Sequence, residues 1–351
     1  MLNKEKIFAL SAEMDRLKKP DRSLLEEICE RRLFKLFVPE QWGGRMTALP
    51  EALEIFETVS ALDGNMGWLV TIGAGGGIFA AYMEPDTART FFSPKEAVIA
   101  GSGVPSGVAR KAEGGYFVSG EWKYCSGASY ATLFTASCRI TGAPAGDGPE
   151  TVRAFAFLPH QVEIIPDWNA FGLRATESHT IRVREAFVPE ERTFSLDERK
   201  SLFEHAIYRY PFQPFAVVSF AAVVLGLARH FLDEAAALAE RSMAAWNAAI
   251  PNRFATVNEH IARAAQRLGE ARETFYRTVR ESWRKVEAGE ALPEEEGAQV
   301  SRIGRQAART AVSCVQDLFP YLGMPAIMED SLTNRIWRDL HTAAQHALLV
   351  Y

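Results

Sequence analysis

The spacing of apolar residues changes twice along this chain of 351 residues, and that change limits the folds it can adopt. Up to about residue 95, apolar side chains recur at helical spacing. From residue 97 to about 194, short β-type runs alternate with turns rich in Gly, Pro, Asp and Asn, and from about residue 203 the helical spacing returns. Apolar residues three or four positions apart mark a helix face, whereas short runs bounded by turn residues mark strands. The sequence therefore predicts helices, then strands, then helices again.

Each segment predicts its own architecture. Residues 1–95 are predicted to form a helical domain. Many short strands without a helix between them indicate an antiparallel barrel or sandwich over residues 96–195, with one of its turns at 142–149. Residues 203–351 are predicted to form a four-helix bundle, with helices at 215–243, 258–286, 299–318 and 334–350. The predicted fold class is α+β in three parts.

The composition narrows the range of partners. A formal net charge of -5, with acidic and basic residues interspersed, argues against nucleic acid or an anionic membrane, because phosphates require clustered Lys and Arg. The uncharged residues 66–83 are interpreted as a buried glycine-rich helix, and the apolar run 217–227 is too short to span a bilayer. Four widely spaced cysteines without a CxxC pair predict reduced thiols and no metal site. The charged N-terminus lacks the apolar stretch of a signal peptide, so a cytoplasmic location is expected.

Three segments, in order along the chain, resemble a known family. Residues 38–44 are VPEQWGG, residues 114–131 are GGYFVSGEWKYCSGASYA, and residues 171–189 are FGLRATESHTIRVREAFVP. Their order and spacing resemble those of acyl-CoA dehydrogenases over nearly the whole chain. The resemblance implies the fold of that superfamily, with an N-terminal helical domain, a central antiparallel β-barrel or sandwich and a C-terminal four-helix bundle. It also implies a flavin bound between the β unit and the bundle.

The sequence near residue 340 resembles one branch of that superfamily. Residues 335–350, RIWRDLHTAAQHALLV, are similar to the corresponding helix of two-component flavin-dependent aromatic monooxygenases, as are residues 122–127 and 174–179. This implies an oxygenase component that uses O₂ and reduced FMN or FAD, supplied by a separate flavin reductase, to hydroxylate an aromatic or heteroaromatic small molecule. Relatives that build the flavin site across subunits imply a homodimer or homotetramer.

Departures from the dehydrogenase pattern leave two alternatives open. The catalytic glutamate of dehydrogenases has no equivalent around His346, and Glu234 and Glu240 are interpreted as exposed partners of basic residues. The runs that hold the adenine half of FAD are replaced at residues 241–246 and 321–326, which favours FMN or a loosely bound reduced flavin. The alternatives are an acyl-CoA dehydrogenase-like enzyme that oxidises an acyl thioester with FAD, and a non-catalytic relative without flavin.

The resemblance implies six cofactor-binding residues. Ser126, which precedes Gly127 at a strand end, matches the Ser or Thr that bonds the flavin near N5, and the adjacent backbone N–H has no side chain in its way. Ser102 lies where the family's strand passes the flavin edge, and Tyr124 replaces an aromatic residue on the flavin face. The other two, from the G-hydrophobic-R-x-T-x-S pattern, are Arg174 and Thr176. The residues alone also allow turn serines at 102 and 126 and a core strand position for Tyr124.

His346 is the candidate catalytic residue. A neutral imidazole can take a proton from a phenol near neutral pH, or hold oxygen activated at the flavin. The alternative is a structural histidine in the bundle. On the predicted helix His341 is rotated by about 140° from His346, at ~100° per residue, so the two do not form one site. Arg338 and Asp339 match an Arg-Asp pair of the family that is expected to be structural.

Overall fold

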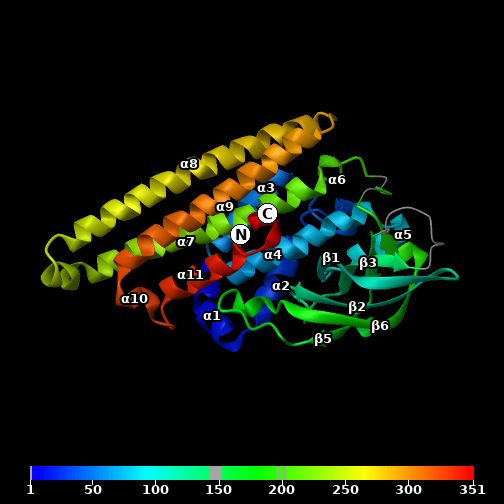
Figure 1. Cartoon of the computed structure of the whole chain (residues 1–351), viewed down its shortest axis with the longest axis horizontal. Coiled ribbons are helices and arrows are strands. Elements are labelled where there is room, and N and C mark those ends of the chain that lie inside the picture. The colour runs from blue at the N-terminus through cyan, green and yellow to red at the C-terminus, as the bar shows by residue number, and fades with distance from the viewer. Residues whose placement is uncertain (1, 142–151, 197, 201–202) are drawn as a thin grey trace.

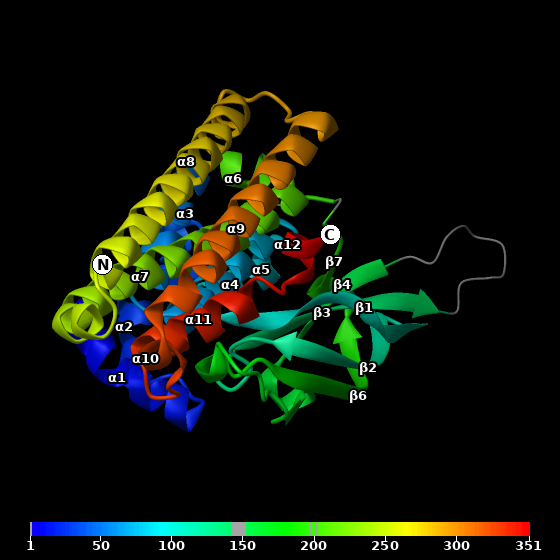
Figure 2. The ribbon, with the colours of Figure 1, turned by 60° about the vertical axis from the view of Figure 1, so that its left-hand side comes forward.

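The computed structural model describes residues 2–141, 152–196, 198–200 and 203–351. Helices extend to Phe92, strands lie between Ile99 and Phe194, and helices return from Ala206. The three regimes of apolar spacing are thus three structural parts, and the predicted fold class is confirmed. The turn predicted at 142–149 lies outside the described residues. Figures 1 and 2 show the sheet beside the long helices, with α4 (Gly64–Gly76) in contact with both.

The N-terminal part consists of short helices, two of which, α2 (Arg22–Glu30) and α4, begin at an acidic cap. Asp21 accepts hydrogen bonds from the backbone of Ser23 and Leu24, and Asp63 accepts one from Met66. The interpretation of residues 66–83 as buried helix is right as far as Gly76, after which a 3-10 turn continues it. Besides α4 the elements are α1 (Lys4–Leu17), α2 (Arg22–Glu30), η1 (Leu33–Lys35), η2 (Glu40–Trp42), α3 (Leu49–Ser60), η3 (Gly77–Ala81) and α5 (Pro85–Phe92).

The VPEQWGG motif is a structural turn closed by a buried lysine. Lys35 Nζ donates to the carbonyl oxygens of Trp42 at 2.7 Å and of Ser93 and Pro94 at 3.1 Å. Burial lowers the pKa of Lys35, and the three carbonyl partners compensate for the water it loses. At Gly44 a Cβ atom would lie 1.9 Å from the carbonyl oxygen of Val38, so only glycine fits there. The motif therefore joins the first helices to the end of α5.

The β part is one seven-stranded sheet in the order β5-β6-β2-β1-β3-β4-β7. All neighbours are antiparallel except β1 and β3, which run parallel, so the expectation of a purely antiparallel unit needs that correction. The strands are β1 (Ile99–Ala112), β2 (Gly115–Cys125), β3 (Leu133–Thr141), β4 (Val152–Phe157), β5 (Glu163–Ile165), β6 (His179–Pro189) and β7 (Thr193–Phe194).

The sheet curves around a core of its own. Strands β2 and β4 are three places apart, yet the rings of Tyr116 and Phe155 are 5.3 Å apart, whereas a flat sheet would separate such strands by about 14 Å. Residues of the opposite face, such as Ile99, Leu133 and Ala156, belong instead to the core that the helices form. Both faces of the central strands are therefore packed, and the face that packs on the helical core adjoins α4.

The C-terminal part is a bundle around one central helix, α7 (Phe212–Ala249). By length and composition α7 could cross a membrane, but 94% of its apolar window is buried inside the protein, as in the core helix of a bundle. The run 217–227, judged too short to span a bilayer, is thus part of a 38-residue helix. The other helices are α6 (Ala206–Arg209), α8 (Arg253–Glu287), α9 (Glu294–Leu322), α10 (Met324–Ile327), α11 (Leu332–Ala343) and α12 (Ala347–Val350).

The continuous helix predicted for residues 334–350 is wrong. α11 ends at Ala343, and His346 is the N-cap of the separate helix α12. The side chain of His346 accepts a hydrogen bond from the N–H of Leu348, which competes with helix continuation through this point. The angle calculated between His341 and His346 on one helix therefore does not apply.

Candidate functional site

A cleft of about 440 Å³ lies between the sheet and the helices. Thr71 and Ile72 of α4 form one wall, Thr135 and Ser137 of β3 another, and the first turns of α7 close it. At Gly75 of α4 a Cβ atom would meet no atom within 4 Å, so this glycine leaves room in the cleft. The volume is typical of a small-molecule pocket.

The cleft is aromatic, with hydroxyl groups placed as acceptors. Ser219 donates to the carbonyl of Phe215, and Thr71 donates to the carbonyl of Gly67, each over 2.8 Å within its own helix. Their hydrogens are used, so their oxygen lone pairs are what they offer to a ligand. No Asp or Glu is among the described residues that line the cleft. The phenylalanines that line it are Phe79, Phe194, Phe212, Phe215 and Phe220.

Ser126 is hydrogen-bonded to Trp68 of α4. Its Oγ accepts the indole N–H of Trp68 at 2.9 Å, and the two side chains are almost entirely buried. Trp68 stacks on Phe220 with ring centroids 5.3 Å apart, and Phe220 lines the cleft. Ser126 is therefore connected to the cleft through Trp68 rather than exposed on its surface.

Behind Ser126 two further hydroxyl groups follow in a row. Ser126 Oγ and Ser178 Oγ are 2.7 Å apart, and Ser178 Oγ and Thr176 Oγ1 are 2.6 Å apart. Thr176 Oγ1 donates to the carbonyl of Leu173 at 2.9 Å. Thr176, predicted from the family pattern, thus reaches Ser126 through Ser178, a residue to which the sequence assigned no role.

The segment that carries these hydroxyls is fixed by α11 and α4. Asp339 accepts the N–H of Leu173 at 2.5 Å, and Arg338 donates to the carbonyl of Phe171. Asn65 of α4 accepts the N–H of Ala175 at 2.9 Å. Leu173 has a φ of 49°, a left-handed backbone that persists only where the surroundings impose it. The Arg-Asp pair therefore acts here by holding the loop that supports Ser126.

Asp339 lies among other acidic groups. Burial raises its pKa to about 8, and the charges of Asp63 and Asp15 add to the effect. Arg338 donates to Asp15 at 2.9 Å, which ties α11 to α1. Burial also raises the pKa of Asp63. Asp339 is therefore mostly protonated near neutral pH, which lets a carboxyl group remain inside the protein without its charge.

His346 reaches the same region from the break between α11 and α12. Its ring lies 3.9 Å from that of Phe220 and 5.9 Å from that of Trp68. Burial lowers the pKa of His346 to about 4, so the ring is neutral at pH 7. Since Nδ1 accepts the N–H of Leu348 at 3.3 Å, the ring hydrogen belongs on Nε2. His346 thus offers a hydrogen-bond donor, and Trp68 stands between it and Ser126.

Gly127 and Ser102 make hydrogen bonds within the protein that the sequence did not predict. The N–H of Gly127 is not free for a ligand, because it donates to the carbonyl of Thr176 at 2.8 Å. Ser102 borders the cleft, but its Oγ accepts the N–H of Val104 at 3.3 Å, as in a turn serine. Gly127 therefore shapes the turn with its φ of 77° rather than donating to a cofactor.

Two predicted cofactor residues lie elsewhere. Tyr124 is 71% exposed and has a φ of 66°, so it neither belongs to the strand core nor lines the cleft. Arg174 is paired with Asp15 at 3.5 Å and with Glu329 at 3.8 Å, which links the loop to α1 and to the segment after α10. Neither residue lines this cleft. The physical reason is that a left-handed turn at Tyr124 rotates its side chain out of the alternation of β2.

Trp68 and Phe220 are the functional candidates that the sequence did not single out. Both lie in apolar helical stretches, where an aromatic ring indicates a core position as readily as a site. Trp68 is distinguished by its bond to Ser126, and Phe220 by its contact with His346. The signal available in the sequence was only the uncharged, glycine-rich run around Trp68.

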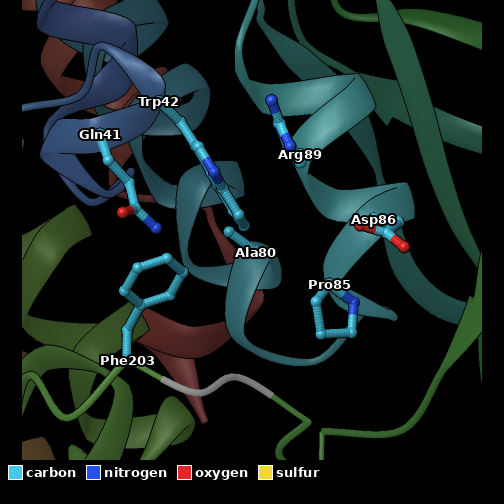
Figure 3. Close-up of a pocket in the computed structure, with 7 residues that line it drawn as sticks. All are labelled: Gln41, Trp42, Ala80, Pro85, Asp86, Arg89 and Phe203. Atoms are coloured by element: carbon cyan, nitrogen blue, oxygen red, sulfur yellow. The ribbon is translucent and has the colours of Figure 1, made fainter.

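A second hollow, of about 370 Å³, lies beside the VPEQWGG turn (Figure 3). The rings of Trp42 and Phe203 meet there edge to face at 5.1 Å, opposite Asp86 and Arg89. None of the predicted site residues lines it. The cleft beside Trp68 is therefore the candidate site.

The residues at the cleft fit a flavin. A flavin ring needs apolar walls and a few polar partners at its edge. Phenylalanine rings supply the walls, and Thr135 and Ser137 supply hydroxyls. Residues 241–246 stand where the family holds the adenine half of FAD, and there Arg241 is paired with Glu234 at 2.6 Å instead. The cleft therefore fits the flavin ring, and this fit does not extend to the adenine half of FAD.

Residues 218–351 match the family model described as acyl-CoA dehydrogenase, C-terminal domain. An indole-3-acetate monooxygenase from Pseudomonas putida is 28% identical over 96% of this chain and 86% of its own length. The oxygenase subunit HsaA of a flavin-dependent monooxygenase from Rhodococcus jostii is 27% identical over 93% of this chain and 87% of its own.

Two solved structures have the same fold. The 3-HSA hydroxylase from Rhodococcus sp. RHA1 superposes with a TM-score of 0.88 at 23% identity, over 98% of this chain and 90% of that one. XiaF from Streptomyces sp., in complex with FADH2 and glycerol, gives 0.85 at 22% identity, over 99% and 91%. The C-terminal part of the chain therefore matches the acyl-CoA dehydrogenase family, and the chain is similar, over more than nine-tenths of its length, to flavin-dependent monooxygenases, one of them an oxygenase subunit.

Proposed function

We propose that this chain is the oxygenase component of a two-component flavin-dependent monooxygenase that hydroxylates an aromatic or heteroaromatic small molecule. The observation that carries the proposal is the aromatic cleft, whose Phe220 contacts Trp68 and His346 behind it. The relatives named as oxygenase subunits favour reduced FMN or FAD as cofactor and a separate flavin reductase as partner.

Reduced flavin, when bound, supplies the two electrons with which O₂ passes one oxygen atom to the substrate and leaves the other as water. This chain's residues bind and orient the reactants. Ser126 offers a hydroxyl to the flavin edge, and Phe215 and Phe220 pack against the substrate ring and exclude water. Ser219 and Thr71 offer acceptors for a substrate N–H or O–H group.

We propose that His346 acts as a hydrogen-bond donor rather than as a general base. Its Nδ1 is occupied by the N–H of Leu348, and its pKa is lowered to about 4, so Nε2–H is the group it offers at neutral pH. A donor placed in a largely buried site stabilises negative charge on a reacting oxygen without itself changing protonation state. Of the two roles expected for His346, this corresponds to holding the activated oxygen rather than to accepting a proton.

The dehydrogenase alternative needs a carboxylate at the reacting carbon. The described cleft residues include none, and Glu234 is paired with Arg241. The non-catalytic alternative requires that no flavin binds. Anaerobic titration of the purified protein with reduced FMN and FAD, followed by addition of O₂, tests the non-catalytic alternative. Binding followed by hydrogen peroxide release without substrate is expected, and failure to bind either flavin would contradict the proposal.

Assembly and location are further proposals. Exposed apolar side chains at one end of the bundle support association into a homodimer or homotetramer, and light scattering at tens of micromolar tests it. Four unpaired cysteines, three of them buried, support a cytoplasmic location. The exposed side chains are Met243, Ile250, Met324, Ile327 and Met328.

A further inference from the structure

The three hydroxyl groups behind Trp68 can be assigned a direction by counting hydrogens. Each hydroxyl donates once and accepts up to twice. Thr176 donates to the carbonyl of Leu173, so the 2.6 Å contact with Ser178 requires Ser178 to donate to Thr176. The hydrogen of Ser178 is then used, and the 2.7 Å contact requires Ser126 to donate to Ser178. The row therefore runs from Ser126 through Ser178 to Thr176.

Ser126 Oγ can make one further hydrogen bond, and only as an acceptor. Its hydrogen points to Ser178, and one lone pair receives the indole N–H of Trp68. The neighbouring backbone donors are also engaged, since the N–H of Ser126 bonds the carbonyl of Tyr124 and that of Gly127 bonds the carbonyl of Thr176. What this turn presents to a ligand is therefore a single lone pair.

A flavin distinguishes donors from acceptors at N5. In the oxidised ring N5 has a lone pair and accepts, whereas in the two-electron-reduced ring N5 carries a hydrogen and donates. We infer that Thr176 is a positioning residue that, through Ser178, holds Ser126 as an acceptor and thereby favours reduced over oxidised flavin. The inference rests on the proposed function, because it requires the flavin to meet Ser126 at N5.

The end of the row is firmly placed. The N–H of Leu173 is held by Asp339, and the carbonyl of Leu173 also accepts the indole N–H of Trp168 at 2.9 Å. That carbonyl can only accept, so it fixes the direction of the hydroxyl next to it. Without Thr176 Oγ1, Ser178 would lose its acceptor and turn its hydrogen to Ser126. Ser126 would then be free to donate to the oxidised ring.

The test is the ratio of dissociation constants for oxidised and reduced flavin, measured anaerobically with FMN and with FAD. Thr176→Val should lower this ratio by about two- to tenfold, the value of one net hydrogen bond. Tenfold corresponds to about 30 mV in the midpoint potential of the bound flavin, which gives a second readout. Thr176→Ser keeps the hydroxyl and should keep the wild-type ratio. Thr278→Val, which removes a hydroxyl bonded within α8, is the matched control.

The possible results distinguish a failure of this inference from a failure of the proposed function. A lowered ratio in Thr176→Val alone supports the inference, and an unchanged ratio overturns it. Should Thr176→Val fail to fold by circular dichroism, Ser178→Ala tests the same row, because it also removes the acceptor for the hydrogen of Ser126. Wild-type protein that binds neither flavin state overturns the proposed function, and this inference with it. That result differs from binding with an unchanged ratio.

Discussion

The indole N–H of Trp68 donates to Ser126 Oγ over 2.9 Å, which joins a helix of the N-terminal part to the end of strand β2. Trp68 also stacks on Phe220 of α7 and lies near His346. One side chain thus contacts residues from the sheet, the central bundle helix and the C-terminal helix break. Substitution of Trp68 should therefore affect the sheet, the central bundle helix and the C-terminal helix break.

Trp68→Phe removes the hydrogen bond but keeps a ring against Phe220. The loss should lower the free energy of unfolding by about 0.5–1.5 kcal/mol, and weaken reduced-flavin binding because Ser126 is less well fixed. Urea denaturation and anaerobic flavin titration measure the two effects. Trp283→Phe is a suitable control, since its indole bonds Glu287 at the far side of the bundle, and it should leave flavin affinity unchanged. Equal affinities in the two variants would argue against the bridging role.

His346→Ala removes the Nε2–H donor. Hydroxylation should fall by about 10²–10³-fold, the usual cost of losing one such donor, while flavin-dependent oxygen uptake continues and yields hydrogen peroxide. His346→Gln retains an N–H donor and should keep more activity than the alanine variant. A general base would be lost equally in both, so identical rates for Gln and Ala would favour that role instead. His341→Ala, whose ring packs on Trp337, should have a much smaller effect.

Asp339 should make the stability of the protein depend on pH in a direction opposite to that of a paired surface carboxylate. Its pKa is raised from 3.8 to about 8 in the folded chain, so between these values the folded state holds a proton that the unfolded state has lost. Stability from this group therefore falls as pH rises from about 4 to about 8, by roughly 1.4 kcal/mol per pH unit at most.

Asp339→Asn should remove that slope, because the amide resembles the protonated acid and still accepts the N–H of Leu173. The difference in unfolding free energy between Asp339→Asn and wild type should then increase with pH up to about 8. Asp339→Ala should instead destabilise at every pH by about 1–3 kcal/mol, since the buried N–H loses its acceptor. Urea melts at pH 5, 7 and 8.5 give the comparison. A pH-independent difference for the Asn variant would show that the carboxyl is ionised in the folded state.

Two adjacent glycines of α4 should respond oppositely to alanine. At Gly75 a methyl group meets open space, so Gly75→Ala should stabilise the helix by about 0.5–1 kcal/mol. At Gly76 the added Cβ would lie 2.7 Å from Cβ of Ile99, so Gly76→Ala should destabilise by about 1–3 kcal/mol. Thermal melts of the two variants measure the sign. Similar shifts would mean that α4 does not approach the sheet as closely as this.

The three-part fold could be predicted because the spacing of apolar residues changes from helical to strand-like and back. The structure departs from the prediction where local polar groups compete with that spacing. Residues 334–350 keep a helical pattern, yet the helix breaks where the His346 side chain captures the N–H of Leu348. The sheet was predicted strand by strand, but the parallel pairing of β1 with β3 is set by packing across the chain, to which short runs give no signal.

The site was only partly predictable, for the same kind of reason. Ser126, Thr176 and His346 were found from sequence patterns, and they lie within one region. Tyr124 belongs to the same pattern as Ser126, but its positive φ turns it to the surface, and a backbone angle is not encoded by residue type alone. Trp68 lies 58 positions from Ser126, so its bond depends on tertiary structure.

The loop at residues 171–178 has a consequence for how the protein is made. Its anchors, Arg338 and Asp339, are more than 160 positions later in the chain, and the partner of Arg338, Asp15, is 323 positions before it. Synthesis proceeds from the N-terminus, so the sheet and α4 exist for many seconds before α11 is available. During that interval the loop lacks its anchors from α11 and keeps the hydrogen bond to Asn65 of α4. The support behind Ser126 is thus complete only when the first and last parts of the sequence have met.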